Sequence, residues 1–379
     1  MMKALKIGIT CYPSIGGSGI VATELGKQLA NKGHEVHFIT TDMPFRLDHV
    51  SARIFYHQVE ISHYPVFQYP PHDLALANKM AEVIDREQLD ILHVHYAMPH
   101  AICAILAKQM ANHHVKVVTT LHGTDITVLG IDKSLTKMIR YGIEQSDAVT
   151  SVSTSLAEET YQIINVNKAI DVVYNFIDTN DYYRSYQKKL KKAFQINESE
   201  KIIVHVSNFR KVKRIEDVII TFAEISKQLA VKLLLVGDGP EYNAMVELVD
   251  QLKIKDRVLF LGNQQNMADL FSIADLNLLM SEKESFGLVL IEAMACQVPC
   301  IGTDVGGIPE VIKDNNNGFI VPLGDTKKAS EIALELLTNQ EMHQRFAKQA
   351  LSSVQAHFTP SVIIAKYEQI YQRILEDED

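Results

Sequence analysis

The chain has 379 residues, a length that predicts two domains rather than one. Its hydrophobic content of 47% and its charged content of 22% are ordinary for a globular protein. The formal net charge of −9 excludes a general binder of nucleic acid or of anionic membranes, so any anion site has to be local.

The chain shows no pattern of a secreted or membrane protein. Its opening, MMKALKIGITCYPSIGG, holds too short an apolar run for a signal peptide, and no stretch approaches the roughly 18 apolar residues of a membrane helix. The four cysteines are widely spread, and Cys296 and Cys300 do not have the spacing of a zinc or redox pair. We therefore expect reduced core cysteines and a cytoplasmic protein. The oligomeric state is left open.

The first half of the chain alternates short apolar runs with helical patterns, which is typical of a parallel, doubly wound sheet. The predicted strands are Leu5–Cys11, Val36–Thr40, Ile91–Val94, Val115–Thr120 and Ala148–Ser151. The predicted helices are approximately Ile20–Lys32, Leu74–Glu87, Ala101–Met110 and Leu135–Glu144. The segment Phe45–Pro71 has no clear period and is predicted to be a long surface connection.

The second half repeats this alternation. Its predicted elements are strands Ile202–Val206, Val231–Val236 and Val258–Leu261 and helices Ile215–Leu229 and Tyr242–Leu252. We therefore predict an α/β protein with two doubly wound domains, residues 1–173 and 174–358, followed by a last helix at about 361–375.

The stretch ESFGLVLIEAMA near the C-terminal end carries two acids. Glu292 lies inside an apolar run, which predicts a short buried helix. A buried carboxylate is costly unless it accepts hydrogen bonds, and the two hydroxyls of a ribose would supply them. Glu284 lies in the loop before the helix, and the first-turn amides of Phe286, Gly287 and Leu288 suit phosphate or sugar oxygens. The structural alternative is a buried acid paired with an arginine.

A glycine loop follows the first predicted strand and opens a helix, so its amides favour an anion. An alternative is a dinucleotide-binding fingerprint, because Gly17, Gly19 and Ala22 fit its spacing and Asp42 lies twenty residues further on. That fingerprint places its first glycine at the end of the strand, whereas here the residues YPSI intervene and make a wider loop. A nicotinamide-dependent dehydrogenase therefore stays as the minority interpretation.

Polar motifs also follow other predicted strands, at the carboxyl ends where open α/β sheets bind ligands. HGTD, from His122 to Asp125, follows Val115–Thr120, and Tyr96 ends the strand before it. SNFRKVKR, residues 207–214, follows the first strand of the second half. Its Arg210 and Lys213 cluster positive charge at a helix start, which is unfavourable against the helix dipole unless an anion binds there.

Together these motifs resemble those of the retaining nucleotide-sugar glycosyltransferases of family 4, the large group that includes sucrose synthase and the mannosyltransferases. ESFGLVLIE, residues 284–292, resembles the E-x7-E signature of that family. The resemblance implies the GT-B architecture, in which two Rossmann-like domains face a central cleft and the last helix crosses back onto the first domain. It implies that Glu292 holds the nucleotide ribose, that Glu284 faces the donor sugar and that His122 donates to a sugar hydroxyl.

The resemblance assigns roles to residues of both domains. The catalytic residues would be His122, Glu284, Arg210 and Lys213. The donor would be bound by Gly17, Ser207, Asn263, Phe286, Gly287, Leu288 and Glu292, and the acceptor by Ser18, Gly19, Tyr96, Thr120 and Asp125. One position departs from the family pattern, since Asn208 stands where relatives have an arginine. Arg210 is expected to supply that charge.

The resemblance is strongest to members that transfer N-acetylglucosamine from UDP-N-acetylglucosamine to the hydroxyl of L-malate, the first step of bacillithiol biosynthesis. A transferase of the same fold with a lipid or polysaccharide acceptor stays as the main alternative. We expect no metal and no other cofactor. His93 and His95 share one face of a strand but have no third ligand at a plausible spacing, and the only Asp-x-Asp pair is Asp377 and Asp379 at the end of the chain.

Overall fold

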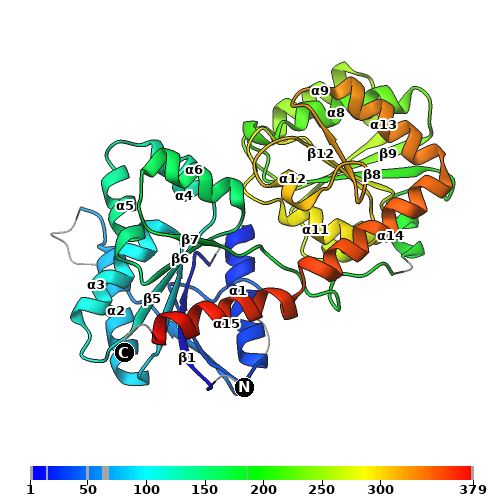
Figure 1. Cartoon of the computed structure of the whole chain (residues 1–379). Coiled ribbons are helices and arrows are strands. Elements are labelled where there is room, and N and C mark those ends of the chain that lie inside the picture. The colour runs from blue at the N-terminus through cyan, green and yellow to red at the C-terminus, as the bar shows by residue number, and fades with distance from the viewer. Residues whose placement is uncertain (1–2, 14–15, 48–50, 62–67, 186, 377–379) are drawn as a thin grey trace. The chain divides into compact units, whose positions relative to one another are not determined.

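The computed structural model describes residues 3–13, 16–47, 51–61, 68–185 and 187–376. The chain forms two compact units (Figure 1): unit 1 consists of Met1–Asn175 and Pro360–Asp379, and unit 2 of Phe176–Thr359. Within the described ranges, no helix combines the length and the apolar character needed to cross a bilayer.

Unit 1 is built on a parallel sheet with the strand order β3-β2-β1-β4-β5-β6-β7. Its strands are β1 (Lys6–Thr10), β2 (Glu35–Thr40), β3 (Ile54–Gln58), β4 (Ile91–His95), β5 (Lys116–Leu121), β6 (Ala148–Ser151) and β7 (Ile170–Val172). Its α-helices are α1 (Gly17–Asn31), α2 (His72–Glu87), α3 (Ile102–Met110), α4 (Thr124–Thr127), α5 (Thr136–Gln145), α6 (Thr154–Ile164) and α15 (Pro360–Glu376).

Unit 2 is built on a second parallel sheet with the order β10-β9-β8-β11-β12-β13. Its strands are β8 (Lys201–Val206), β9 (Val231–Val236), β10 (Val258–Gly262), β11 (Leu276–Leu279), β12 (Cys300–Thr303) and β13 (Phe319–Val321). Its α-helices are α7 (Lys188–Ala193), α8 (Ile215–Ser226), α9 (Tyr242–Gln251), α10 (Met267–Ile273), α11 (Leu288–Ala295), α12 (Ile308–Val311), α13 (Thr326–Thr338) and α14 (Gln340–His357).

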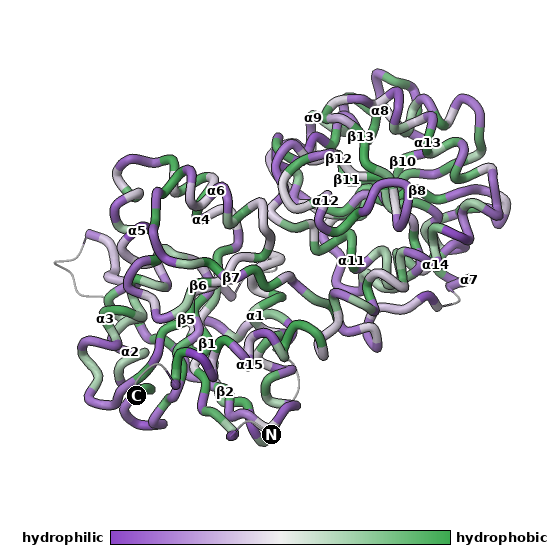
Figure 2. Tube along the Cα trace, viewed as in Figure 1, coloured by the Kyte–Doolittle hydropathy of each residue, from purple (hydrophilic) through white to green (hydrophobic). Residues whose placement is uncertain are grey.

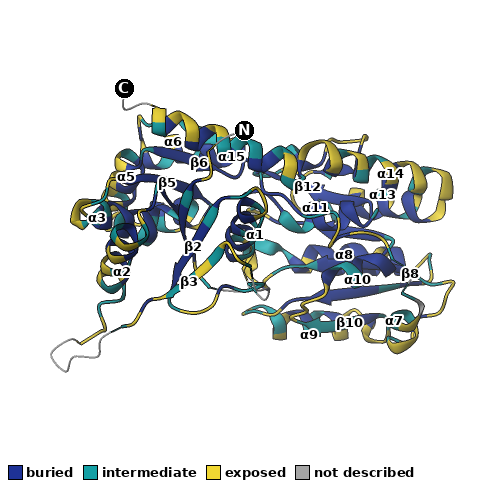
Figure 3. Ribbon diagram, turned by 90° about the horizontal axis from the view of Figure 1, so that it is seen from below, coloured by how far each residue is buried: buried dark blue, intermediate teal, exposed yellow. Residues whose placement is uncertain are grey.

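The predicted α/β class with two doubly wound sheets is confirmed. Parallel sheets are covered by helices on both faces, and their central strands are therefore rich in buried β-branched and leucine side chains. The two central strands β4 and β8 follow this rule, with completely buried residues such as Ile91 and Ile203. Hydrophobic residues gather along the central strands in Figure 2, and Figure 3 shows these strands as buried while the outer faces of the helices are exposed.

The prediction of a surface connection over Phe45–Pro71 is wrong for part of that segment. Residues Ile54–Gln58 form β3, which pairs in parallel with β2 at the edge of the sheet. The sequence IFYHQ hides this strand because one side of an edge strand faces water, so Phe55 is 41% exposed and polar residues interrupt the apolar run. The parts of the segment at 48–50 and 62–67 lie outside the described residues.

The C-terminal helix α15 is an integral part of unit 1 and packs beside α1. Its residues Tyr367 and Tyr371 are buried. The hydroxyl of Tyr371 is hydrogen-bonded to Nδ1 of His93 on the central strand β4 at 2.7 Å. Both side chains are completely buried, so the bond lies in the core of unit 1.

The substitution Tyr371→Phe should therefore destabilise unit 1. It leaves a buried imidazole nitrogen without its partner, which typically costs about 1–3 kcal/mol. The free energy of unfolding from urea titration measures this change. Tyr161→Phe is the matched control, because the hydroxyl of Tyr161 accepts from the amide of Ile170 at 3.0 Å but its side chain is 40% exposed. Equal losses in the two variants would contradict this role of α15.

Candidate functional site

Each sheet contains one point at which the order of strands reverses along the chain. In unit 1 it lies between β1 and β4, and in unit 2 between β8 and β11. The loops that leave two such strands run in opposite directions, so a crevice opens at their carboxyl ends, where doubly wound proteins bind ligands. Most of the sequence-predicted residues follow these strands, in the next loop or helix, whereas Thr120, His122 and Asp125 lie at the end of β5 and Asn263 follows β10.

In unit 1, the loops after β1 and β4 meet at Ser18 and Tyr96. The hydroxyl of Tyr96 donates to Oγ of Ser18 at 2.7 Å. Ser18 lies in the first turn of α1, which begins at Gly17, and the backbone of Tyr96 has φ of +87°, which a side chain other than glycine rarely adopts. Tyr12 was not among the predicted site residues, yet its ring is 40% exposed and lies 5.3 Å from that of Tyr96. Aromatic character in the loop after β1 was its only signal.

The HGTD loop is held from within by Asp125. Its completely buried carboxylate accepts hydrogen bonds from the backbone amides of Ala97 at 3.0 Å, Gly123 at 2.9 Å and His122 at 3.2 Å. Asp125 thus orients the loop through its backbone. The hydroxyl of Thr120 is buried as well, so neither side chain presents an oxygen at the surface of unit 1.

Three imidazole rings form a column beside this loop. The rings of His93 and His95 stack at 4.8 Å, and those of His95 and His122 stack at 5.0 Å. Nδ1 of His95 is hydrogen-bonded to Nε2 of His122 at 2.8 Å. Nε2 of His93 is hydrogen-bonded to the hydroxyl of Thr120, which also bonds that of Thr150, both at 2.7 Å. Thr120 therefore holds the column at the ring of His93.

Burial keeps these histidines neutral. It lowers the pKa of His93 and of His122 to about 3 and that of His100 to about 4, and it lowers the pKa of His95 well below the ordinary value. A half-buried, neutral His122 can donate one N–H to a ligand without placing a positive charge beside it.

In unit 2, the loops after β8 and β11 are joined by an ion pair. Nζ of Lys213 lies 2.7 Å from Oε2 of Glu284, and both side chains are largely buried. Arg210 precedes Lys213 on the loop after β8 and is exposed. Because the ammonium group of Lys213 lies at the point where the strand order reverses, an anionic ligand that binds there can compete with Glu284 for it.

Glycines bring the neighbouring loops into direct backbone contact. A Cβ atom on Gly306 would lie 2.0 Å from the carbonyl oxygen of Glu284, and one on Gly307 would lie 2.3 Å from that of Ser285. Likewise, a Cβ on Gly237 would lie 1.8 Å from the carbonyl oxygen of Ser207. The turns after β9 and β12 therefore support the loops that bear the polar residues. Asn263, after β10, is exposed at the same edge.

The hydroxyl of Ser207 is oriented by His205, which sequence reasoning missed. His205 is buried, with Nδ1 2.8 Å from the carbonyl oxygen of Leu278 and Nε2 2.8 Å from Oγ of Ser207. Burial lowers the pKa of His205 to about 4, so the ring is neutral. Because a carbonyl only accepts, Nδ1 carries the proton and Nε2 accepts from the serine.

The acid of the predicted buried helix is found in α11. This helix starts at Leu288, after Gly287 with φ of +87°. Glu292 is 7% exposed, and its Oε1 accepts from the hydroxyl of Tyr182 at 2.7 Å. Tyr182 lies more than a hundred residues away in the sequence and gave no signal of its own.

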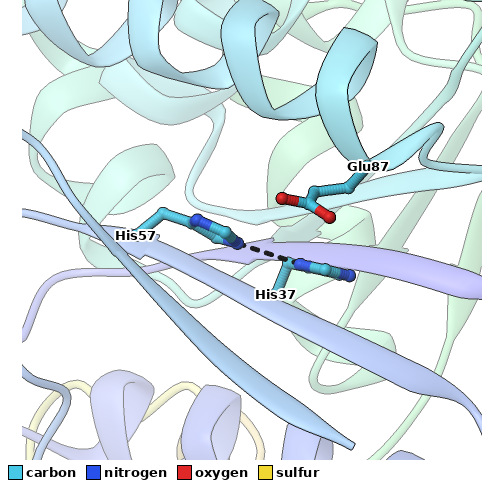
Figure 4. A group of neighbouring side chains, drawn as sticks. All are labelled: His37, His57 and Glu87. Atoms are coloured by element: carbon cyan, nitrogen blue, oxygen red, sulfur yellow. Dashed lines mark hydrogen bonds between the residues drawn. The ribbon is translucent and has the colours of Figure 1, made fainter.

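One group of potential metal ligands is present among the described residues. His37, His57 and Glu87 bring ligand atoms within 4.8 Å of one another (Figure 4). However, Arg86 donates to Nδ1 of His57 at 2.9 Å, so Nε2–H of His57 donates to Nδ1 of His37 at 2.9 Å. His37 then donates from Nε2 to Glu35 at 3.1 Å. These hydrogen bonds occupy the imidazole lone pairs that a metal would need, and Arg86 adds a positive charge. We therefore interpret the group as a hydrogen-bond network.

Comparison with known proteins identifies relatives along both units. Residues 15–181 match the family described as Glycosyltransferase Family 4, and residues 186–352 match that described as Glycosyl transferases group 1. The chain is 59% identical to N-acetyl-alpha-D-glucosaminyl L-malate synthase of Bacillus anthracis, over 99% of this chain and 98% of that protein. It is 26% identical to D-inositol 3-phosphate glycosyltransferase of Mycolicibacterium smegmatis, over 73% of this chain and 67% of that one.

Solved structures show the same fold. A glycosyltransferase of Rickettsia africae superposes with a TM-score of 0.84 at 21% identity, covering 100% of both chains. Anabaena Alr3699/HepE, solved in complex with UDP-glucose, superposes with a TM-score of 0.80 at 20% identity, covering 98% of this chain and 99% of that one. The predicted GT-B fold is thereby confirmed.

Acid should destabilise unit 1 before unit 2. When folding lowers the pKa of a histidine, its contribution to stability is complete at any pH above the pKa of the unfolded state, about 6.5. That stability is lost as the pH falls toward the folded values of about 3 to 4. Among the described residues, the affected histidines are His37, His57, His93, His95, His100 and His122 in unit 1 and His205 and His343 in unit 2.

Hydrogen exchange at pH 7.5 and pH 5, corrected for the intrinsic exchange rate, measures this difference. The opening free energy should fall more for the amides of β4 and β5 than for those of β8 and β9. An equal or larger fall in unit 2 would show that other groups control the acid stability.

Proposed function

This chain belongs to the family 4 glycosyltransferases, and from that premise we propose its specific reaction. It transfers N-acetylglucosamine from UDP-N-acetylglucosamine to the hydroxyl of L-malate, with retention of configuration, as the first step of bacillithiol biosynthesis. The observation that carries the proposal is the 59% identity to a synthase of that name along 99% of the chain.

In this proposal, unit 2 binds the donor. The carboxylate of Glu292 accepts from the ribose hydroxyls, because an ionised carboxylate only accepts and its two oxygens match a diol. The base lies against the backbone near Asn263. The amides of Phe286, Gly287 and Leu288 face the phosphates or the sugar, and Glu284 faces the sugar.

The positive charges after β8 act on the diphosphate. Departure of UDP leaves negative charge on the phosphate oxygens, and Lys213 and Arg210 stabilise it. The Lys213–Glu284 pair holds the ammonium group in place before the donor binds. No metal is required in this scheme, since the two cations and the loop amides meet the same charge.

Bond changes follow from retention. The bond between C1 of the sugar and the diphosphate oxygen breaks, and a bond between C1 and the malate hydroxyl oxygen forms on the same face. The malate proton passes to the departing phosphate oxygen, so no protein side chain has to act as a covalent nucleophile. His122 donates a hydrogen bond to a sugar hydroxyl near the reacting carbon.

Unit 1 binds the acceptor in this proposal. L-Malate is a dianion and the chain carries a net charge of −9, so local donors have to hold it. The amides of Gly17 to Gly19 at the start of α1 and the hydroxyl of Ser18 are such donors, and Tyr96 orients Ser18 by donating to its oxygen. Asp125 acts on the acceptor only by orienting its loop, and Thr120 by supporting the imidazole column. We also propose a cytoplasmic location, which agrees with four buried free cysteines.

A product assay tests this function. Purified protein with UDP-N-acetylglucosamine should glycosylate L-malate far better than lactate or glycerol, because a site built for two carboxylates leaves its donors unpaired with either analogue. Mass spectrometry of the products measures the preference. Equal use of lactate or glycerol would reduce the proposal to a transferase of another acceptor, and a lack of product with every acceptor would overturn it.

Glu292→Gln should weaken the binding of UDP. The amide replaces an acceptor oxygen with a donor that faces the ribose diol, and a charge-assisted hydrogen bond is typically worth about 1.5–3 kcal/mol. The dissociation constant from calorimetry should therefore rise about tenfold to 150-fold. Glu282→Gln removes the same charge from an exposed position nearby and should leave the affinity unchanged. Unchanged affinity in the Glu292 variant would contradict the ribose assignment.

A further inference from the structure

We propose that His95 is a positioning residue for His122, whose tautomer it sets so that the proton of His122 lies on Nδ1. This inference rests on the proposed role of His122 as the donor to the sugar. It adds a residue to the site that touches no substrate and acts through its hydrogen bond to the donor.

The first step is the position of His95 in the column. Its ring is completely buried between those of His93 and His122, with stacking distances of 4.8 and 5.0 Å. His93 is itself held at both nitrogens, by Tyr371 at 2.7 Å and by Thr120 at 2.7 Å. His95 therefore has little freedom to turn, and its Nδ1 stays 2.8 Å from Nε2 of His122.

The second step is the location of the protons. Nε2 of His95 is buried and has no hydrogen-bond partner among the described residues. A neutral imidazole has a single N–H, and an orphaned buried N–H is rarer in proteins than an orphaned acceptor. The proton of His95 is thus on Nδ1 and is donated to Nε2 of His122. Since Nε2 of His122 accepts, the proton of His122 lies on Nδ1.

The third step is the consequence for the site. In the described part of the chain, no hydrogen bond joins Nδ1 of His122 to another residue, and His122 is only partly buried. The tautomer set by His95 therefore directs the single N–H of His122 away from the column, where a sugar hydroxyl can accept it. The same hydrogen bond occupies the lone pair on Nε2 and so opposes protonation of His122.

The surroundings hold other ionisable groups that bear on this pair. Those on β4 and on the turn after it are His93, Tyr96 and His100, and the loop after β5 contributes Asp125. Further groups are Tyr12 and Cys11 after β1 and Tyr367 and Tyr371 on α15. Asp125 is the only carboxylate in this set, and backbone amides of its own loop already bind it.

The experiment compares His95→Leu with His95→Asn. Leucine removes the N–H, whereas the amide nitrogen of asparagine can occupy the place of Nδ1 and donate to His122. His95→Leu should lower kcat about tenfold or more, with little change in KM for UDP-N-acetylglucosamine, and His95→Asn should recover most of it. Without the bond, Nε2 of His122 can take a proton, so its pKa rises and the acid limb of the kcat–pH profile moves to higher pH in the leucine variant.

The matched control is His34→Leu, which removes another buried imidazole of unit 1 outside the column. It should keep the wild-type kcat and pH profile. In wild-type protein labelled with 15N-histidine, NMR should show His122 protonated at Nδ1. That measurement decides the assignment even if the leucine variant does not fold.

Three results would overturn the inference. They are a proton on Nε2 of His122, a His95→Leu variant with wild-type kcat and pH profile, and equal losses of kcat in His95→Leu and His95→Asn without a shift in the acid limb of the kcat–pH profile. The proposed function fails separately. If wild-type protein makes no glycoside, or if His122→Ala keeps full activity, the role of His122 is wrong, whereas the NMR result still reports on the tautomer.

Discussion

Parallel strand pairing is the constraint on which both units depend. All strands of a parallel sheet end at the same edge, so the loops that follow them gather there whatever their sequence. The reversal of strand order between β1 and β4, and between β8 and β11, keeps helices from covering that edge at one point in each unit. Ser18 and Tyr96 meet at the first point and Lys213 and Glu284 at the second, although each pair is at least 71 residues apart in the chain.

The two units stabilise the buried polar groups at these edges in different ways. Unit 1 stacks neutral imidazoles, whose hydrogen bonds link α15 through His93 to the strand ends. Unit 2 uses compensated charge, with Glu284 beside Lys213 and Glu292 beside the hydroxyl of Tyr182. The neutral column leaves the N–H of His122 for the proposed contact with the sugar without placing a fixed charge beside it. Paired charges suit the proposed diphosphate, whose own charges can enter the pairing.

Close backbone contact explains three of the glycines of unit 2. Gly306 and Gly307 lie against the carbonyls of Glu284 and Ser285, and Gly237 lies against that of Ser207. Any side chain at these positions would displace the loops that carry the proposed donor-binding residues. The turns are therefore part of the site's support, although they contribute no side chain to it.

The sequence by itself determined the fold class, the family and the positions of the motifs, because apolar periodicity and the E-x7-E spacing are local properties of the chain. It also placed Glu292 on a short buried helix. Only the tertiary structure decided which residues partner these groups. Tyr182 beside Glu292 and His95 beside His122 come from other strands or loops, and such a long-range pairing leaves no periodic trace in sequence. His205 precedes Ser207 by only two residues, but the sequence does not show that the two side chains are hydrogen-bonded. The edge strand β3 was missed for a related reason, since its half-exposed residues follow from its place in the sheet.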